Sequence, residues 1–430
     1  MNISADTRFL PQQAASARRI FVGLEKLFSI FAIMYFTNGF FVRFLLEASM
    51  GSALSNLNLL IYFGSTGLFA VHCQGRRFTG AVFFGVAPFL VLSFASVLWS
   101  IDPSHSLRQA IGFFGISVFG LYLTTRFTFR TIINLLCWAF GSLLVGSFLL
   151  GAGAPSIGVE QGSLHRGAWI GGFTHKNELG MNSAFSVLLF ALRARSATTP
   201  FRTWFFSGFT LLAFLLVLLT TSSTALVVSS SMLALILFLY YLRGRRLLFV
   251  AFSLFAIVGL SVAALVLISN LEQAADLLGK DLTLTGRTYL WSDSIEAWQE
   301  RPLLGYGFDA FWLETSREAN RIRARRFWDV PHSHNGAVDV LLDLGVTGLI
   351  FSVGLFVYLL LSALRFFQGS RSQVALWPLS ILFYILMSNI TESNFVKQKS
   401  FEWVLLIVMA NFPYLKQLRG RVGVYVNDKS

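Results

Sequence analysis

Two histidines followed by regularly spaced polar residues are the first candidates for chemistry. His332 and His334 precede Asn335, Asp339 and Asp343. An imidazole titrates near neutral pH and is the most frequent general base in enzymes. The last three residues recur every four positions, so they share one helical face. Acids in an otherwise apolar segment are costly, so Asp339 either orients a neighbouring His or Arg or forms a structural hydrogen-bonding pair between helices.

A metal site at these histidines is an alternative that the sequence does not favour. His332 and His334 are two positions apart, and no third ligand is evident beside them. The only cysteines, Cys73 and Cys137, lie in or beside apolar segments elsewhere. This spacing indicates neither a zinc site nor a disulfide framework. We therefore expect no metal and no cofactor.

Cationic residues in two glycine-containing motifs are candidates for binding a phosphate. Arg166 and Lys176 flank a segment whose glycines permit close backbone approach. Lys176 should lie at the start of a helix, and that end of a helix favours anions. Arg287, in Gly-Arg-Thr-Tyr-Leu-Trp, has a planar fork suited to bidentate binding of a phosphate or a carboxylate. The alternative for 166–177 is an interfacial loop with incidental charge.

Arg108 is a further cationic candidate and follows the motif Trp-Ser-Ile-Asp-Pro-Ser-His-Ser-Leu. The Asp-Pro step favours a turn, and Ser104 or Ser106 could cap the next helix. Arg108 should lie near the outer end of that helix, where membrane orientation requires no positive charge, so a partner or ligand is expected. The alternative is a structured turn between two spans.

The segments between these motifs are apolar enough to cross a membrane. Of the 430 residues, 55% are hydrophobic and 13% are charged, against about 25% charged in soluble proteins. A span needs roughly 20 mostly apolar residues. The predicted fold is an all-α polytopic membrane protein with about twelve transmembrane helices. The predicted spans lie near 28–46, 57–73, 80–99, 107–125, 131–150, 178–193, 203–220, 224–242, 247–269, 336–364, 374–390 and 401–415.

The basic residues indicate how these spans are oriented. The net charge of +13 is carried by short clusters between apolar runs, a pattern of membrane orientation rather than of nucleic-acid binding. The clusters occupy alternate connections and both ends of the chain, so both termini should be cytoplasmic. The residue pattern at the N-terminus does not indicate a cleaved signal peptide. We therefore expect the first apolar run to be a retained span.

Two predicted outer loops are long enough to be functional. The second covers about 65 residues, and the spacing of Leu290, Ser294 and Trp298 predicts a short amphipathic helix on the bundle. The predicted division of the chain is a cytoplasmic segment 1–27, nine spans in 28–269 with the outer loop 151–177, the outer loop 270–335, three spans in 336–415, and a cytoplasmic tail 416–430.

The motifs, taken in this order, resemble the O-antigen ligase and polymerase family. They are Trp-Ser-x-Asp-Pro with Ser-Leu-Arg, His-Lys-Asn, Gly-Arg-Thr-x-Leu-Trp with Pro-Leu-Leu-Gly-Tyr-Gly, and His-Ser-His-Asn with Leu-Gly-Val-Thr-Gly. The resemblance covers roughly residues 80–390, and Gly-Gly-Phe-Thr-His-Lys-Asn is most similar to the ExoQ-like exopolysaccharide branch. Thr221-Ser222-Ser223-Thr224 lacks the basic residue of the family's pattern.

The resemblance implies a metal-independent membrane glycosyltransferase in the bacterial inner membrane, working at the periplasmic face. The donor would be a glycan on undecaprenyl diphosphate. The acceptor would be another lipid-linked repeat unit in a polymerase, or lipid A–core in an O-antigen ligase. Membrane lipids, a chain-length regulator and export proteins are the other partners that it suggests.

The resemblance also assigns roles to the candidate residues. His334 is the first candidate for the base and His332 the second, with Asp339 beside them. Arg166 and Arg287 match the family's motif positions best and would hold the leaving diphosphate; Lys176 and Arg108 are the further candidates for that role.

A transporter or channel is the alternative from a different class of protein. Such proteins tend to have interrupted helices at the midplane and paired internal repeats, and the sequence shows neither clearly. The ionisable residues instead concentrate at the predicted outer boundary. We therefore favour the enzyme, and the polymerase over the ligase.

Overall fold

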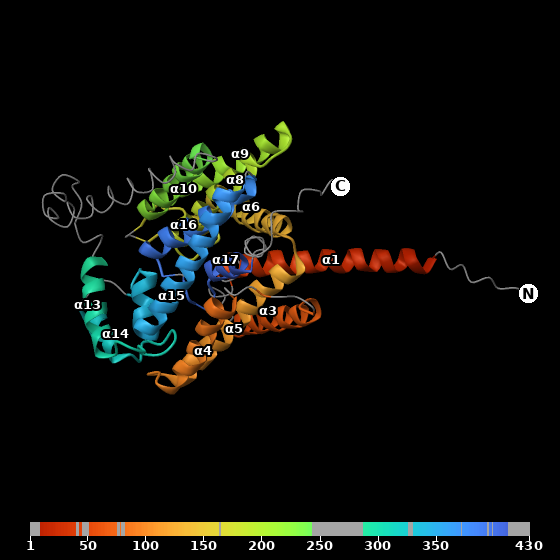
Figure 1. The fold of residues 1–430 in the computed structure, drawn as a ribbon. Coiled ribbons are helices and arrows are strands. Elements are labelled where there is room, and N and C mark those ends of the chain that lie inside the picture. The colour runs from red at the N-terminus through yellow and green to blue at the C-terminus, as the bar shows by residue number, and fades with distance from the viewer. Residues whose placement is uncertain are drawn as a thin grey trace, which may run out of the picture.

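The structure is a computed structural model, and every element of regular secondary structure in its described part is helical (Figure 1). A single isolated bridge pairs Val159 with Trp169 there. Seven helices of the described part are long and apolar enough to cross a membrane. The described residues are 9–39, 43–44, 51–74, 78, 82–162, 165–242, 287–325, 330–370, 372–393, 395–397 and 399–411.

The helices follow one another closely along the chain. Most are joined by short turns, and three pieces are short π- or 3-10 turns labelled η. Their bounds are α1 (Phe9–Phe36), α3 (Gly51–His72), η1 (Val82–Val86), α4 (Ala87–Ala95), η2 (Ser96–Leu98), α5 (Pro103–Arg126), α6 (Phe129–Gly153), α7 (Pro155–Gly158), α8 (Lys176–Arg195), α9 (Pro200–Leu219), α10 (Ser223–Leu242), α13 (Arg287–Glu300), α14 (Arg317–Ala324), α15 (Gly336–Gly369), η3 (Gln373–Ala375), α16 (Leu376–Thr391) and α17 (Phe401–Ala410).

The predicted all-α membrane fold is confirmed in its class, whereas the number of twelve spans stays a prediction. Each predicted span that falls in the described ranges overlaps a helix. The predicted ninth span at 247–269 and the tail at 416–430 lie outside the described residues. The short helix predicted around Leu290 is present as α13, with Leu290 buried.

The first helix differs from its prediction at both ends. It already begins at Phe9, inside the segment predicted to precede the span, and it ends at Phe36 rather than near residue 46. Asn38, with φ +56°, follows this end. A left-handed residue after a helix cannot continue it, and Asn adopts that conformation more easily than most residues.

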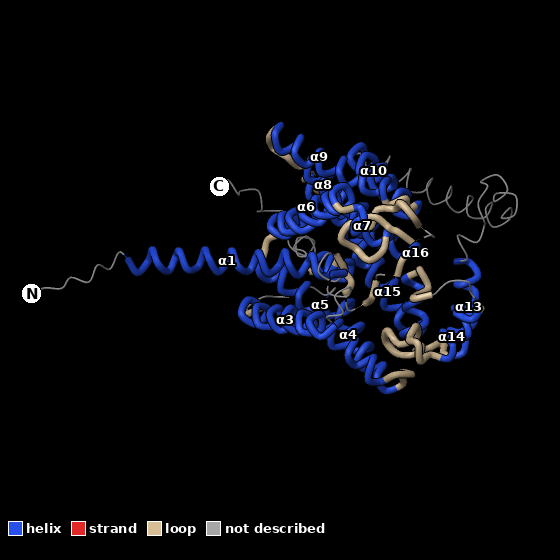
Figure 2. The backbone as a smooth tube through the Cα atoms, turned by 180° about the vertical axis from the view of Figure 1, so that it is seen from behind, coloured by secondary structure: helices blue, strands red, loops and turns tan. Residues whose placement is uncertain are grey.

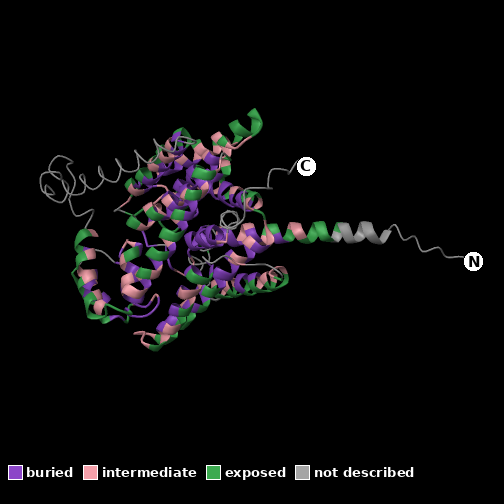
Figure 3. Cartoon of the chain, viewed as in Figure 1, coloured by how far each residue is buried: buried purple, intermediate pink, exposed green. Residues whose placement is uncertain are grey.

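The bundle packs around α17, in which every residue is buried. Its Trp403 stacks on Phe113 of α5, with ring centroids 4.7 Å apart, and donates to Ser117 Oγ at 2.8 Å. Figure 3 shows buried residues where the helices meet and exposed ones on the outer faces. Large apolar side chains such as Phe201 and Trp204, both 77% exposed, suit a lipid-facing surface.

A buried ionic cluster joins three helices away from the motifs. The Glu25 carboxylate of α1 lies 2.6 Å from Arg126 of α5 and 2.6 Å from His72 of α3. Glu25 is 2% exposed. Since a buried charge is costly unless it is paired, this cluster fixes how the three helices meet.

Helix α15 is interrupted at Gly345, whose backbone has φ +65° and ψ −164°. The segment 302–307, Pro-Leu-Leu-Gly-Tyr-Gly, lies along the break: Tyr306 N donates to Leu342 O at 2.8 Å, and Val346 N donates to Pro302 O at 2.8 Å. A Cβ at Gly345 would overlap the backbone of Leu303. The sequence analysis found no interrupted helix, and this was wrong.

The same segment contacts the first motif, and this unites three of the four sequence motifs in one scaffold. Trp99 Nε1 donates to Leu304 O at 2.9 Å, and Ile101 N donates to Tyr306 O at 3.0 Å. Helices α13 and α14 lie beside α15 in both views (Figures 1 and 2). The Leu342 carbonyl and the Val346 amide on the two sides of the break are thus paired within the protein.

Candidate active site

The candidate site lies at one end of the bundle, where several helices begin or end. Helices α8, α13 and α15 start there, at Lys176, Arg287 and Gly336, and α16 ends there at Thr391. The residue after α16, Glu392, contacts residues from all three of the others. Segments as far apart as 215 residues in the sequence therefore meet in one place.

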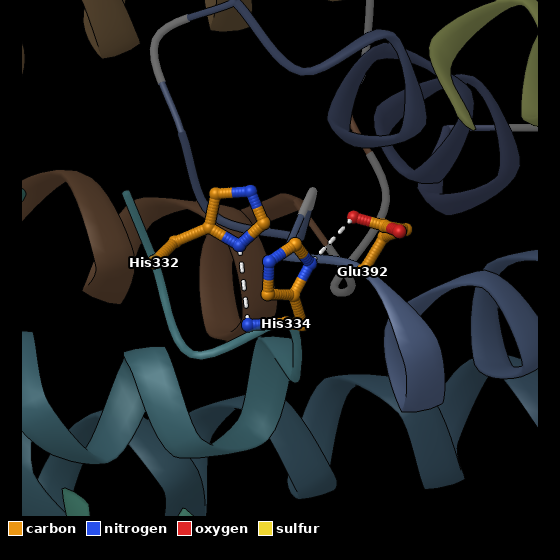
Figure 4. Close-up of side chains that lie close together, drawn as sticks. All are labelled: His332, His334 and Glu392. Atoms are coloured by element: carbon orange, nitrogen blue, oxygen red, sulfur yellow. Dashed lines mark hydrogen bonds and ion pairs between the residues drawn. The ribbon is translucent and has the colours of Figure 1, made fainter. Parts of the chain in front are cut away.

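His334 and Glu392 form a hydrogen-bonded pair at the centre of the site (Figure 4). His334 Nδ1 lies 3.2 Å from Glu392 Oε2, and the two side chains are 15% and 10% exposed. A carboxylate can only accept, so Nδ1 carries the proton in this contact. Whenever His334 is neutral, its other ring nitrogen is the proton acceptor, and in Figure 4 that nitrogen faces the His332 ring.

Glu392 also binds the two motifs that precede it in the chain. Its Oε1 accepts from Asn177 Nδ2 at 3.1 Å and lies 3.4 Å from Arg287 Nη2. Ser222 Oγ in turn donates to Asn177 Oδ1 at 3.0 Å. Burial alone would raise the pKa of the Glu392 carboxyl, but the hydrogen bond and charge of His334, with His332 and Arg287 nearby, lower it below its usual range. The carboxylate is therefore ionised at neutral pH.

The turn that carries His334 is fixed by its own backbone. His334 has φ +54°, a conformation that is rare outside glycine. Its backbone N–H donates to His332 Nδ1 at 3.1 Å, and Asn335 caps α15 by accepting from Ala337 N and Val338 N. Strained backbone held this way is typical of functional sites, because the surroundings must over-determine it.

His332 supports His334 and is a poor base itself. The two imidazole rings are in contact, with centroids 4.1 Å apart and planes tilted by 55°. Burial lowers the pKa of His332 well below its usual range, and the nearby charges of Lys397 and His334 lower it further. Because its Nδ1 already accepts from the His334 backbone, His332 is neutral and positions the turn.

Asp339 is buried and holds the turn from the other side. Its Oδ1 accepts from Trp312 Nε1 at 2.9 Å and from Ser333 N at 3.1 Å, and its Oδ2 lies 3.5 Å from Lys397 Nζ. The contacts support the interpretation that Asp339 orients the histidine segment, through Ser333 rather than through a ring. A positioning role for Asp339 stays a prediction.

Lys397 belongs to a second charged group beside the first. Burial would lower the pKa of Lys397, but the charges of Asp339 and Asp309 raise it above its usual range. Burial raises the pKa of Asp309, whose Oδ2 lies 4.0 Å from His105 Nε2 on α5. Lys397 therefore remains charged and compensates Asp339 at the buried start of α15.

The other predicted cations are placed less centrally. Lys176 is the first residue of α8, and burial lowers its pKa. Arg166 is exposed in the loop before it, next to His165, whose ring centroid is 5.8 Å from that of His175. Arg108 is exposed on α5, near Asp102, and no hydrogen bond or ion pair joins it to Glu392 or His334.

The cap of α5 differs from the prediction. Asp102 is the N-cap, with Oδ1 accepting from His105 N at 2.9 Å, and Ser104 Oγ donates to the same oxygen. Ser106 is buried and donates to Phe308 O at 2.9 Å. An Asp caps as well as a Ser, and its place directly before proline fits the first turn of a helix.

The site offers a third candidate metal ligand that the sequence did not reveal. Ligand atoms of His332, His334 and Glu392 lie within 4.8 Å of one another. Zinc requires bonds of about 2.0–2.2 Å to one centre, so the three side chains would have to draw together. Arg287, 3.4 Å from Glu392, adds a positive charge that opposes a cation. The arrangement fits an acid–base pair better, and metal independence stays a prediction.

Comparison with known proteins shows what the sequence is similar to. Residues 208–353 match the family model described as O-Antigen ligase. The predicted resemblance to the O-antigen ligase and polymerase family is confirmed. The chain is also 27% identical, over 342 residues, to the exopolysaccharide production protein ExoQ of Rhizobium meliloti (strain 1021). That match covers 76% of this chain and 74% of ExoQ, so it extends well beyond the matched family segment.

Sequence reasoning missed two residues of the site, Glu392 and Lys397. Both lie in the short connection between α16 and α17, which was predicted only as an outer loop. Glu392 follows the apolar run of α16 directly, and an acid placed immediately after a predicted span is the one signal that could have singled it out. Lys397 carried no motif.

Proposed function

We propose that this chain is a glycosyltransferase that polymerises lipid-linked oligosaccharide repeat units at the periplasmic face of the bacterial inner membrane. The observation that carries the proposal is the His334–Glu392 pair at 3.2 Å, set beside Arg287 at one end of an apolar helical bundle. The match to O-antigen ligases and the similarity to ExoQ support the same class of reaction. The predicted orientation, with both termini cytoplasmic, puts this end outside.

The proposed reaction is a direct displacement at the anomeric carbon of the donor sugar. A hydroxyl of the acceptor sugar loses its proton to the unprotonated ring nitrogen of His334 as its oxygen bonds the anomeric carbon. The carbon–oxygen bond to the lipid diphosphate breaks, and the bonding electrons leave with the diphosphate. Glu392 stabilises the resulting imidazolium, as a carboxylate does when it accepts from the other ring nitrogen.

The leaving diphosphate requires fixed positive charge. Arg287 keeps its proton at any physiological pH and offers a planar set of donors. Lys176 stands at the start of α8, the end of a helix whose dipole favours an anion. Arg166 is exposed nearby and Arg108 is more distant, so we place Arg287 and Lys176 first and Arg166 next.

The assignment of the base is tested with purified full-length protein and a lipid-diphosphate-linked oligosaccharide. His334→Gln should lower the rate of glycosyl transfer by about 100-fold or more, the usual contribution of general base catalysis. The matched control is His105→Gln, a histidine at the same end of the bundle that does not contact Glu392. Wild-type rates from a folded His334→Gln protein would refute the assignment.

The O-antigen ligase is the alternative, favoured by the description of the matching family. The similarity to ExoQ over three quarters of the chain leads us to place the polymerase first. A deletion strain distinguishes them. Loss of high-mass exopolysaccharide with intact lipopolysaccharide supports the polymerase, whereas O-antigen left on its lipid carrier supports the ligase and excludes the polymerase.

A further inference from the structure

The Arg287 guanidinium is held by Glu392 more loosely than either of the other two groups that share this carboxylate. Its Nη2 lies 3.4 Å from Oε1, whereas Asn177 Nδ2 lies 3.1 Å from the same oxygen and His334 Nδ1 lies 3.2 Å from Oε2. Charge-assisted bonds usually measure about 2.7–2.9 Å. The ionic contact is therefore well short of its strongest geometry, although both charges are largely buried.

We propose that the donor's diphosphate takes Arg287 from Glu392, so that donor binding and the release of Glu392 to His334 are one exchange. The inference rests on the proposed function and names the regulation of that same site. In the structure, the Glu392 carboxylate contacts both the Arg287 guanidinium and the His334 imidazole. When the diphosphate binds, Arg287 binds the diphosphate instead, and Glu392 keeps its hydrogen bond to His334.

The charges favour this exchange. A lipid diphosphate carries more negative charge than one carboxylate, and its oxygens match the planar fork of Arg287 in pairs. Lys176, at the start of α8, adds a second positive charge that attracts the diphosphate. The diphosphate therefore offers Arg287 a stronger partner than a carboxylate at 3.4 Å.

The exchange leaves no buried oxygen of Glu392 unpaired. Oε1 still accepts a hydrogen bond from the side-chain amide of Asn177, and Oε2 still accepts one from His334. The Asn177 side chain is itself held by Ser222, whose Oγ donates to Asn177 Oδ1 at 3.0 Å. An orphaned buried carboxylate oxygen would cost about 1–3 kcal/mol or more and would oppose the swap. Because both oxygens stay bonded, Arg287 can move without that penalty.

Other titratable groups lie near Glu392 and His334. The His332 ring contacts the His334 ring, Arg287 lies on α13, and His175 and Glu178 at the start of α8 are close enough to interact electrostatically with Glu392. Asp339 and Lys397 are close enough to interact electrostatically with His332. Glu392 is hydrogen-bonded to both Arg287 and His334, so it couples the cation to the base.

The exchange predicts that one substitution changes binding and turnover in opposite directions. Glu392→Gln removes the anion that competes for Arg287, so inorganic diphosphate and farnesyl diphosphate should bind about 2- to 5-fold more tightly. The same variant loses the charge that supports imidazolium, so turnover should fall by about 10- to 100-fold. A merely structural residue would not give tighter binding together with slower turnover.

A matched control exists on α13. Glu296 also pairs with an arginine at 3.4 Å, Arg325, and is far more exposed. Glu296→Gln makes the same change of charge and should leave diphosphate affinity and turnover within about 2-fold of wild type.

Binding is measured by calorimetry on the full-length protein in detergent, and turnover with the lipid-linked oligosaccharide. Tighter binding by Glu392→Gln, with Arg287→Ala at least about 10-fold weaker than wild type, supports the exchange. Unchanged or weaker binding by Glu392→Gln overturns it. If Arg287→Ala binds diphosphate as wild type does, the proposed donor site fails instead, so the two failures are distinct.

Discussion

Replacing Gly345 by alanine should destabilise the scaffold that positions the active site. The backbone there, φ +65° and ψ −164°, lies in a region that is essentially restricted to glycine and costs other residues about 1–3 kcal/mol. The new Cβ would also overlap the backbone of Leu303 and Leu304. Overpacking of that kind costs about 1–3 kcal/mol. The sum is about 2–6 kcal/mol.

A small shift cannot relieve the overlap, because hydrogen bonds hold the facing backbone on both sides of the break. Tyr306 N and Gly307 N donate to Leu342 O and Asp343 O, and Val346 N donates to Pro302 O, at 2.8–3.0 Å. Pushing this segment away would break these bonds. The displaced start of α15 carries Asp339 and the histidine turn, so activity should fall together with stability.

The assay is thermal unfolding in detergent, followed by the fluorescence of the ten tryptophans, together with the rate of glycosyl transfer. Gly354→Ala is the control in the same helix, since a Cβ there meets nothing within 4 Å and alanine favours a helix over glycine by about 1 kcal/mol. If Gly345→Ala matches Gly354→Ala in both measurements, the break in α15 is not a structural requirement and the reasoning is wrong.

Two further predictions concern charge. Glu25→Gln leaves Arg126 without its buried counter-ion and should lower the free energy of unfolding by about 3 kcal/mol, which thermal unfolding would detect; an unchanged midpoint would mean that the cluster is replaced by water. The lowered pKa of His332 means that unfolding takes up a proton once the pH falls below its ordinary value of 6.5, so stability is full above pH 6.5 and declines below it. His332→Gln should therefore reduce the loss of unfolding midpoint between pH 7.5 and pH 5, and an identical loss in both proteins would contradict the burial argument.

The sequence predicted what depends on local pattern. Apolar runs of sufficient length identified the helices, and the four-residue spacing of Asp339 and Asp343 correctly placed both acids on a buried helical face. The spacing of Leu290, Ser294 and Trp298 correctly predicted the short helix α13. These predictions succeeded because periodicity and helix starts are properties of neighbouring residues.

The sequence could not predict which distant segments meet. The break in α15 is invisible locally, because Leu-Gly-Val-Thr-Gly reads as an ordinary apolar helix and Gly345 becomes special only where the segment 302–307 docks. The end of α1 likewise depends on Asn38 in a left-handed conformation within an apolar run. Both errors came from reading apolar composition as a continuous helix, although backbone conformation decides where a helix stops.

Glu392 shows why a site can be half predicted from motifs and still lack its centre. Each motif contributes one group, His334, Arg287 or Asn177, and each of these three is hydrogen-bonded to Glu392. Their common partner is a single carboxylate after α16, which the sequence presents as an ordinary acid in a short loop. Since a buried carboxylate must be fully paired, its position requires all three motifs to converge. Glu392 thus joins the separate motifs into one site. Its replacement should tighten diphosphate binding and slow turnover.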